Sequence, residues 1–573
     1  MNKTIKIVLG IIGALIALVI IAVILFAVFF DANAYRGQIV ATVQEKTGRS
    51  MTLGAIHVSL FPTLGLKIDD ATLGNAEGFG EQPFAQIGEV DVGVRVLPLL
   101  FDHELDVESI YLMGLSLDLQ RNAKGVSNWD DLLAKNAKAS GKPASAKNNA
   151  SSAPAIRSIH IGSVHVSGAS VRYRDATSGQ DVRLEDFSFE VGALGSSKPS
   201  IFKTSFKTIS SKPAVSAKIN ASGKLTLNMP AKRYAVQNLK LEVEAAGSGI
   251  PGGKQVLNIS GDAEYNGKAG SMRLAGGEIE VAGLIVHASL DVSGLNDHKL
   301  SFKGPIRVEE FSPRKVAKAL GINYQPQDDT ALKTASLKAQ ISGTADSAKV
   351  SDLKIKLDDT TAQGSLALTS LKQPAAKFNL GVDTINVDRY MPVAAAQAAR
   401  QGNDKAGAAV GDTPIPVDKL DTFSADGTLK IGKLVLHGVK MSDASVRINA
   451  HKGAAKKVAL SAKLYGGSID SHTGITPGST PRYSEKMEFK GVDLGPLVHD
   501  ATGKDILKGT GNITANLTSS GKTVNAVRQA LGGKVALSLK DGALKGLDLA
   551  RIIRQVSTLV NSGGDVSAAM ATT

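Results

Sequence analysis

The sequence contains no cysteine, which excludes disulfide bonds, thiol catalysis and cysteine-based metal sites. Aromatic residues make up only 5% of the chain, and Trp129 is the single tryptophan. Nucleic-acid platforms need exposed aromatic rings beside basic residues, so no nucleic-acid partner is expected. The motifs of phosphate-binding loops, nucleophile elbows and zinc proteases are also missing. We therefore expect neither an enzyme nor any catalytic residue, cofactor or metal.

The composition is that of a chain that buries apolar surface. Hydrophobic residues make up 43% of the 573 residues and charged residues 21%. This length leaves room for several ordinary domains or for one long repetitive structure. The net charge of +13 would draw the protein to anionic lipid head groups near a membrane. Most of the lysines are nevertheless expected on solvated outer faces of strands.

A single uncharged run covers residues 7–30, with Lys3 and Lys6 before it and Asp31 directly after it. As a helix it would be roughly 36 Å long, enough to cross a bilayer core of about 30 Å. A cleaved signal peptide is the alternative, but its apolar part is usually only about 7–15 residues long. The flanking charges then predict a cytoplasmic N-terminus and a long non-cytoplasmic remainder. The anchor residues are represented by Ile7, Leu15, Ile21 and Phe30.

Beyond the run, a short helix is expected over residues 34–46, ended by Gly48. From Met51 onward apolar and polar residues alternate, which predicts strands with one apolar and one polar face. The clearest apolar stripes are Val90, Val92, Val94 and Val96, then Leu115, Leu117 and Leu119, and later Leu429 and Ile431. Turn signals such as Asn266–Gly267 and Asp541–Gly542 divide the strands, and the spacing fits an antiparallel meander.

Helical signals are few and short. They cover residues 129–135, 313–320, 523–531 and 548–559. Two low-complexity segments, residues 135–155 and 394–416, read as linkers. They divide the part after residues 1–33 into β regions at 34–134, 156–393 and 417–573. An insertion within one continuous sheet would explain each segment equally well.

A sheet with one apolar face has to cover that face, and the helices are too few to do so. The strands could form sandwiches with dry cores. They could instead form an open trough whose inner face is covered by lipid acyl chains. Periodicity alone leaves both open. In the second case the stripes named above would line the groove, and with no polar group marking a head-group site it would recognise acyl chains in bulk.

The remaining candidate residues have simpler explanations. His160 and His165 are expected on opposite strand faces, unsuited to binding a metal together. The adjacent pairs Asp69–Asp70, Asp130–Asp131 and Asp358–Asp359 would also point to opposite faces, as turn or edge residues do. They are the only support for an enzyme that acts on envelope polymers. Tyr465, Gly466 and Gly467 are expected to mark a bend in the sheet.

Several phrases in consistent order resemble the bacterial AsmA family. They include YRGQIVATVQEKTGRSMTLGAIHVSLFPTLGLKIDDATLGN at 35–75, IGEVDVGVRVLPLL at 87–100, FNLGVDTINVDRYMP at 378–392 and LGGKVALSLKDGALKGLDLARII at 531–553. The likeness covers most of the chain and is weakest between about residues 190 and 350.

The resemblance implies a single-pass inner-membrane protein of a Gram-negative bacterium with most of the chain in the periplasm. AsmA-like proteins, with TamB- and YhdP-like members, are related to chorein-type bridge-like lipid transfer proteins. The implied fold is a long antiparallel sheet curled into a hydrophobic groove. The implied role is phospholipid transport between the inner and outer membranes, in support of outer-membrane integrity. A scaffold or assembly factor for outer-membrane proteins is the alternative.

Overall fold

The computed structural model describes residues 31–59, 64–95, 105–132, 159–194, 198–392, 415 and 424–544. These residues form two compact units. The first contains the described residues up to Gly304 together with Lys315–Asn323, and the second contains Pro305–Arg314 and the described residues from Tyr324 onward. Strands dominate both units and the helices are few and short, which confirms the mainly β fold predicted from the alternating pattern.

The first unit begins with two short helices, η1 (Ala32–Tyr35) and α2 (Arg36–Thr47). The Asp31 side chain accepts a hydrogen bond from the Asn33 backbone N–H at the start, and Gly48 ends α2 at a φ of 75°. The helix expected over residues 34–46 is thus confirmed. Ala32 packs in a buried cluster with Leu53 and Ile56, which joins the helices to the first strands.

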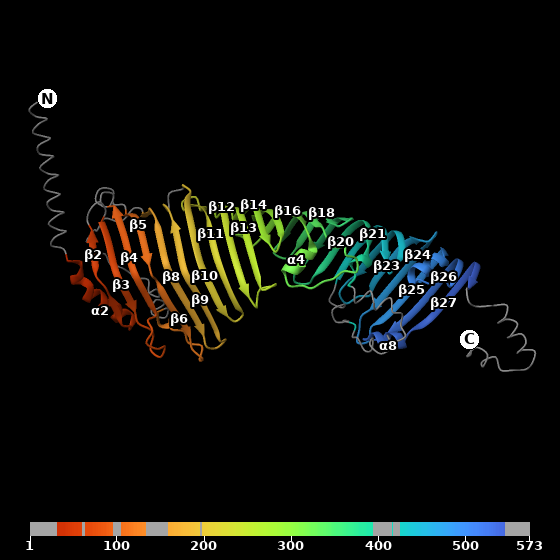
Figure 1. The fold of residues 1–573 in the computed structure, drawn as a ribbon, viewed down its shortest axis with the longest axis horizontal. Helices are drawn as coiled ribbons and strands as arrows, with labels where there is room; N and C mark the ends of the chain where they lie inside the picture. The colour runs from red at the N-terminus through yellow and green to blue at the C-terminus, as the bar shows by residue number, and fades with distance from the viewer. Residues whose placement is uncertain are drawn as a thin grey trace, which may run out of the picture. The chain divides into compact units, whose positions relative to one another are not determined.

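The strands of the first unit follow in chain order. They are β1 (Met51–Leu53), β2 (Ile56–Ser59), β3 (Leu64–Leu73), β4 (Ala85–Arg95), β5 (Leu105–Met113), β6 (Ser116–Arg121), β7 (Ile159–Ile161), β8 (Val164–Asp175), β9 (Gln180–Val191), β10 (Ser200–Ser211), β11 (Ala214–Asn228), β12 (Arg233–Gly247), β13 (Lys254–Asn266), β14 (Ser271–Val281) and β15 (Leu284–Ser293). From β8 to β15 each strand pairs with the next in antiparallel register, and Figure 1 shows β8 to β13 side by side.

One part of this sheet corrects the expected antiparallel meander. β5 and β6 pair in parallel with β7 and β8, from Leu105 opposite Ile159 to Arg121 opposite Asp175. The alternating pattern could not show this, because a half-buried strand alternates in the same way whichever direction its neighbour runs.

β16 (Ser301–Phe311) and α4 (Pro313–Ala319) contain the boundary between the two units, and α4 confirms the helix expected at 313–320. The elements of the second unit are β17 (Ala335–Thr344), β18 (Ala348–Leu357), β19 (Thr360–Leu368), β20 (Ala375–Asn386), η3 (Val387–Tyr390), β21 (Ser424–Leu436), β22 (Val439–Ala450), β23 (Lys456–Leu464), β24 (Gly467–Thr476), β25 (Arg482–Asp493), α7 (Leu494–Thr502), β26 (Leu507–Ser520), α8 (Val524–Gln529) and β27 (Gly532–Leu544). α8, with Thr523 as its N-cap, confirms the helix expected at 523–531.

In the second unit, too, one pair is parallel. β20 pairs with β21 from Ala375 opposite Ser424 to Asn386 opposite Val435, while β21 to β27 are antiparallel. The two low-complexity segments fall in the connections that lead into these parallel pairs. Parallel neighbours need a connection of about a dozen residues or more, whereas antiparallel neighbours need only a tight turn. Strands before and after each segment therefore lie side by side: β6 pairs with β8 across the first segment, and β20 pairs with β21 across the second.

Turns and bulges explain the glycine-containing signals. Asn266–Gly267 lies in the turn from β13 to β14, as expected. Asp541–Gly542 does not divide two strands; it lies inside β27, where Asp541 has a φ of 52° beside a shift in register. An aspartate followed by glycine accommodates positive φ in a bulge as readily as in a turn, so the turn prediction was wrong there. Tyr465 and Gly466, both at positive φ, form the tight turn between β23 and β24.

Some predictions lie outside the described residues. They include Ile7, Leu15, Ile21 and Phe30 of the apolar run, the helix expected at 548–559, and residues 133–135 of the helix expected at 129–135, which begins at Asp130 and is described to Leu132. Among the described residues, no helix combines the length and apolar character needed to cross a membrane. The domain boundaries proposed from sequence stay predictions; the division between the two units falls elsewhere, near residues 304–324.

Candidate functional site

The first unit carries an apolar row that crosses ten strands in direct register. Each residue lies opposite the next across one strand pair: Val90 (β4), Leu112 (β5), Val166 (β8), Phe189 (β9), Thr204 (β10), Ala221 (β11), Leu241 (β12), Ile259 (β13), Ile279 (β14) and Val286 (β15). At about 4.8 Å between strands the row is roughly 40 Å long. Its single hydroxyl, on Thr204, donates to the Ser188 carbonyl at 2.9 Å.

No residue of this row is fully buried, and Ile279 is 38% exposed. In a second row Leu66, opposite Val92, is 43% exposed. Within the described part of this unit, the buried apolar cluster lies at the N-terminal end, around Ala32, Leu53 and Ile56. A dry core would bury such residues, so the protein leaves this face partly uncovered.

The stripe residues predicted from sequence occupy this face. Val90, Val92 and Val94 lie in β4, and Leu117 and Leu119 lie in β6. The structure places Leu115 in the bend between β5 and β6 rather than in a strand. Val96 is outside the described residues.

The opposite face of the first unit is polar. Asp91, Tyr111, His165, Glu190 and Lys203 form its corresponding row, and the rings of Tyr111 and His165 stack with centroids 4.6 Å apart. A hollow of about 750 Å³ on this face is lined by lysine and glutamate side chains together with serine and asparagine. The two faces therefore differ completely in chemistry.

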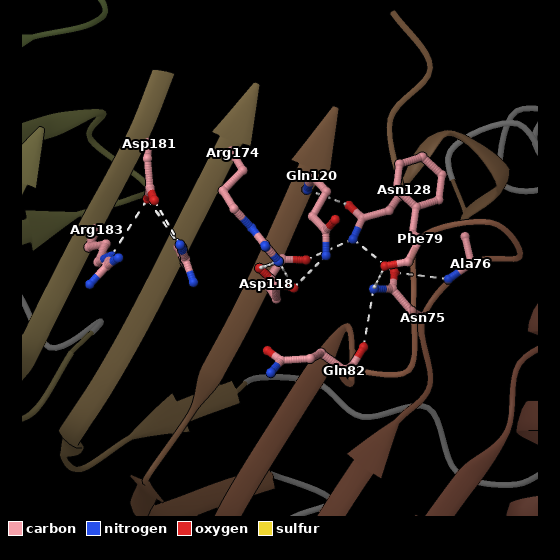
Figure 2. A network of polar contacts seen from close by, with 11 residues as sticks. Asn75, Ala76, Phe79, Gln82, Asp118, Gln120, Asn128, Arg174, Asp181 and Arg183 are labelled. Atoms are coloured by element: carbon pink, nitrogen blue, oxygen red, sulfur yellow. Dashed lines mark hydrogen bonds and ion pairs between the residues drawn. The ribbon is translucent and has the colours of Figure 1, made fainter. Parts of the chain in front are cut away.

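A polar network at one end of this face fixes the loop after β6, as Figure 2 shows. Asn128 is fully buried, and its side chain accepts from the Gln120 N–H at 2.9 Å and donates to Asn75 and to the Asp118 carbonyl. The Asp118 carboxylate binds Arg174 at 2.8 Å. The contacts of Asn128 satisfy an amide that would otherwise be buried without partners, which indicates a structural role for this residue.

Arg49, the residue after the Gly48 that ends α2, links the helix to the same loop. It is 3% exposed, lies over the Phe84 ring, and holds the Asp131 carboxylate with Nε at 3.0 Å and Nη2 at 2.5 Å. Burial raises the pKa of Asp131, but the hydrogen bond and charge of Arg49 outweigh it, so the net pKa is lowered.

The second unit has an apolar face of the same kind. Leu380, Leu429, Val446, Leu460, Ser471, Met487, Ala515 and Val535 form a row in register from β20 to β27. Of the predicted residues, Leu429 is half-buried, whereas Ile431 is buried in a cluster with Ala444 and Ala462. α7 packs over one end of this face, where Leu494 joins a buried cluster with Leu464 and Val492.

A polar group interrupts this second apolar face, where the sequence had marked no polar site. Glu485 lies in register between Thr473 and Leu517, and its carboxylate accepts from the Ser471 hydroxyl at 2.6 Å and from the Thr473 hydroxyl. Sequence reasoning missed it, although Ser471, Thr473 and Glu485 occupy positions where the alternation of β24 and β25 calls for apolar residues.

Five of the six adjacent aspartates predicted as turn or edge residues have side-chain partners, one of them the Asp131–Arg49 pair described above. Asp69 binds His57 at 2.9 Å, and Asp130 accepts from the Ser127 N–H at 2.8 Å. Asp358 accepts three backbone N–H groups, from Leu332, Lys333 and Thr334, and Asp359 binds Arg389 at 2.7 Å. In the part of the chain that the structure describes, no three His, Asp or Glu side chains gather as a metal site would need.

The sequence model of the AsmA family matches residues 1–570. The chain belongs to the AsmA family. This confirms the resemblance drawn from the strand phrases, and the one-sided sheets agree with it. A search of curated proteins found no match to this AsmA-family chain.

Proposed function

We propose that this AsmA-family protein binds phospholipid acyl chains on its apolar sheet faces and carries phospholipids between the inner and outer membranes, in support of outer-membrane integrity. The observation that carries the proposal is the row from Val90 to Val286, in which no residue is fully buried. Contiguous apolar patches larger than a few hundred Å² usually mark a ligand or membrane site. Acyl chains would cover such a face without any specific polar contact.

Bulges in the first sheet support a curled, groove-like surface. Register shifts accompany Asp186 between β9 and β10, Asn238 between β11, β12 and β13, and Gly276 between β14 and β15. Each bulge bends its strand and increases the local twist. Repeated along a sheet, such bends favour a trough that can hold a flexible chain.

We also propose that the protein is located at the inner membrane. Residues 7–30 would cross the inner membrane once, with the N-terminus in the cytoplasm and the bulk of the chain in the periplasm. The partners are then phospholipid acyl chains and the inner membrane, together with the outer membrane or its proteins. We propose no enzymatic activity, cofactor, metal or nucleic-acid partner.

A matched pair of variants tests lipid contact on the full chain. Ile259 and Asn258 are neighbours in β13 whose side chains belong to opposite faces, and Leu241 lies directly opposite Ile259. A photo-crosslinking amino acid at Leu241 should capture phospholipid in cells. Ile259→Asp should reduce the lipid adducts by about tenfold or more, because a charge is costly among acyl chains. Asn258→Asp should leave them unchanged.

Ile259 is not fully buried, so its substitution should leave the sheet folded, which protease resistance would verify. Absence of lipid adducts at Leu241 would contradict the proposal. So would equal adducts from a crosslinker at Lys240, on the polar face. Unfolding of Ile259→Asp would instead indicate a dry core.

One observation favours the alternative role as a scaffold for outer-membrane proteins. β27 is the last described strand and pairs with β26, and its Val535 and Leu537 are 64% and 59% exposed. Such an edge could pair with a strand of a client protein. Crosslinkers at Val535 or Leu537 would capture nascent barrel proteins if this role holds, and lipid if it does not.

A further inference from the structure

The polar face of the second unit contains a hollow lined by basic side chains. Arg447 (β22), Lys457 (β23), His472 (β24) and Lys486 (β25) surround a space of about 660 Å³. Register places Arg447 opposite Ala459, Ala459 opposite His472, and His472 opposite Lys486, so these residues share one face.

Small residues create the space between these side chains. Ala459 and Gly474 lie between the basic positions, and neither projects a side chain long enough to fill the gap. Asn449, Ser484, Asn516 and Thr518 complete the lining with groups that can donate hydrogen bonds.

The charge of this hollow is not neutralised by the described residues. Arg447, Lys457 and Lys486 are exposed, and none of them forms an ion pair within the described part of the chain. Glu485 contributes to the lining from the apolar face, where Ser471 and Thr473 hold its carboxylate. His472 is already paired with Asp470 at 3.0 Å.

The hollow on the polar face of the first unit differs from this one in its charge. It is slightly larger, but Glu190, Glu242 and Glu278 line it together with Lys203 and Lys240. The hollow of the first unit thus has side chains of both charges, whereas the hollow of the second unit has three unpaired cations. Solubility alone would not require the three cations to surround one hollow.

We propose that the basic hollow of Arg447, Lys457 and Lys486 binds the phosphate groups of anionic phospholipid head groups at a bilayer surface. Arginine offers paired donors that match phosphate oxygens, and lysine adds point charges. Each basic residue at an anionic membrane surface contributes enough to raise binding about fivefold. This site lies on the face opposite the proposed acyl-chain surface and does not depend on it.

The test uses the full chain held in phosphatidylcholine nanodiscs. These are mixed with large vesicles of phosphatidylcholine alone or of equal parts phosphatidylcholine and phosphatidylglycerol, and co-sedimentation is measured. The triple variant R447Q/K457Q/K486Q should bind the anionic vesicles about a hundredfold more weakly, by the per-residue factor. The charge-preserving variant R447K/K457R/K486R should keep most of the binding and shows whether the positions tolerate substitution.

The matched control is K338Q/K354Q/K356Q, which removes three exposed, unpaired cations from the polar face of the same unit but outside the hollow. It should change vesicle binding by less than about threefold, because these lysines would not be in the contact. An equal loss in the control would show general surface charge and overturn the site. Equal binding to vesicles with and without phosphatidylglycerol would overturn the membrane assignment. Binding of inorganic phosphate by a chain that does not bind the vesicles would also overturn it.

Discussion

Tyr465 shows how a single side chain joins distant parts of the second unit. Its hydroxyl donates to the Asp500 carboxylate of α7 at 2.6 Å and accepts from the Lys440 backbone N–H of β22 at 3.1 Å. The Lys440 ammonium also lies 3.0 Å from Asp500. Tyr465, which the sequence predicted at a bend and the structure places in a tight turn, thus also holds α7 beside the apolar face.

Tyr465→Phe should lower the free energy of unfolding of the second unit by about 1–2 kcal/mol at neutral pH, the usual contribution of a hydrogen bond to a charged acceptor. Denaturant unfolding of the full chain would measure the change. Tyr234→Phe is the matched control, since its hydroxyl has no hydrogen-bond partner among the described residues and its ring keeps its stacking on Tyr265. An equal loss in both variants would contradict the assigned role.

The same pair has a defined dependence on pH. Burial and the Asp500 hydrogen bond raise the pKa of Tyr465 to about 12, from about 10 in an unfolded chain. Because folding raises this pKa, the protonated Tyr465 stabilises the folded state fully below about pH 10. This stabilisation is lost as the pH rises towards 12. Tyr465 and Lys440 lower the pKa of Asp500, so its contribution is lost only in acid. The deficit of Tyr465→Phe should therefore be largest at neutral pH and shrink above pH 10.

At the scale of elements, the two parallel pairings require a minimum length of the low-complexity segments. The strand path from Leu105 to Arg121 is roughly 50 Å long at about 3.3 Å per residue. Ser127 and Asn128 pair beside β6 at the Arg121 end, whereas Ile159 starts beside Leu105. The intervening chain must therefore be long enough to cover this distance, whatever its sequence.

Deletion of residues 135–154 should abolish the parallel pairing of β6 with β8. The few residues left between Leu132 and Ile159 reach at most about 25 Å. Amide hydrogen exchange in β8 should become roughly tenfold faster or more, since its opening would no longer require unfolding of the unit. Replacement of the same residues by a Gly/Ser sequence of equal length should preserve protection. Normal protection after deletion would refute the length requirement.

Particular residues show what the sequence could and could not predict. The stripe of Val90 and Val92 identified the face, because burial on one side imposes a period of two. The same period carries no information on strand direction, so the parallel pairs were missed. Bulges left a usable signal: at Asn238 and Asp352 the apolar residues change from even to odd positions. Glu485 was missed because its carboxylate is satisfied by hydroxyls from a neighbouring strand.

At the scale of the whole molecule, side-chain contacts fix the residues directly after residue 30 to the first sheet. Asn33 exchanges two hydrogen bonds with Ile56, at 2.9 and 3.0 Å, and Arg36 donates to the Leu53 carbonyl. Ala32 is buried against the same strands. If residues 7–30 cross the inner membrane as proposed, the apolar face of β2 to β4 starts at the bilayer surface, where lipid could enter it.

This junction leads to a prediction about the anchor. A chain in which a cleavable signal peptide replaces residues 1–30 should fold normally in the periplasm, because the contacts of Ala32, Asn33 and Arg36 remain. It should nevertheless fail to support outer-membrane integrity, since nothing would hold its first strands at the inner membrane. An unrelated apolar helix of the same length should restore function, because only position matters. Detergent sensitivity of cells and protease resistance of the protein would measure the two properties separately. Full activity of the released chain would refute entry of lipid at the junction and favour a carrier that moves freely between the membranes.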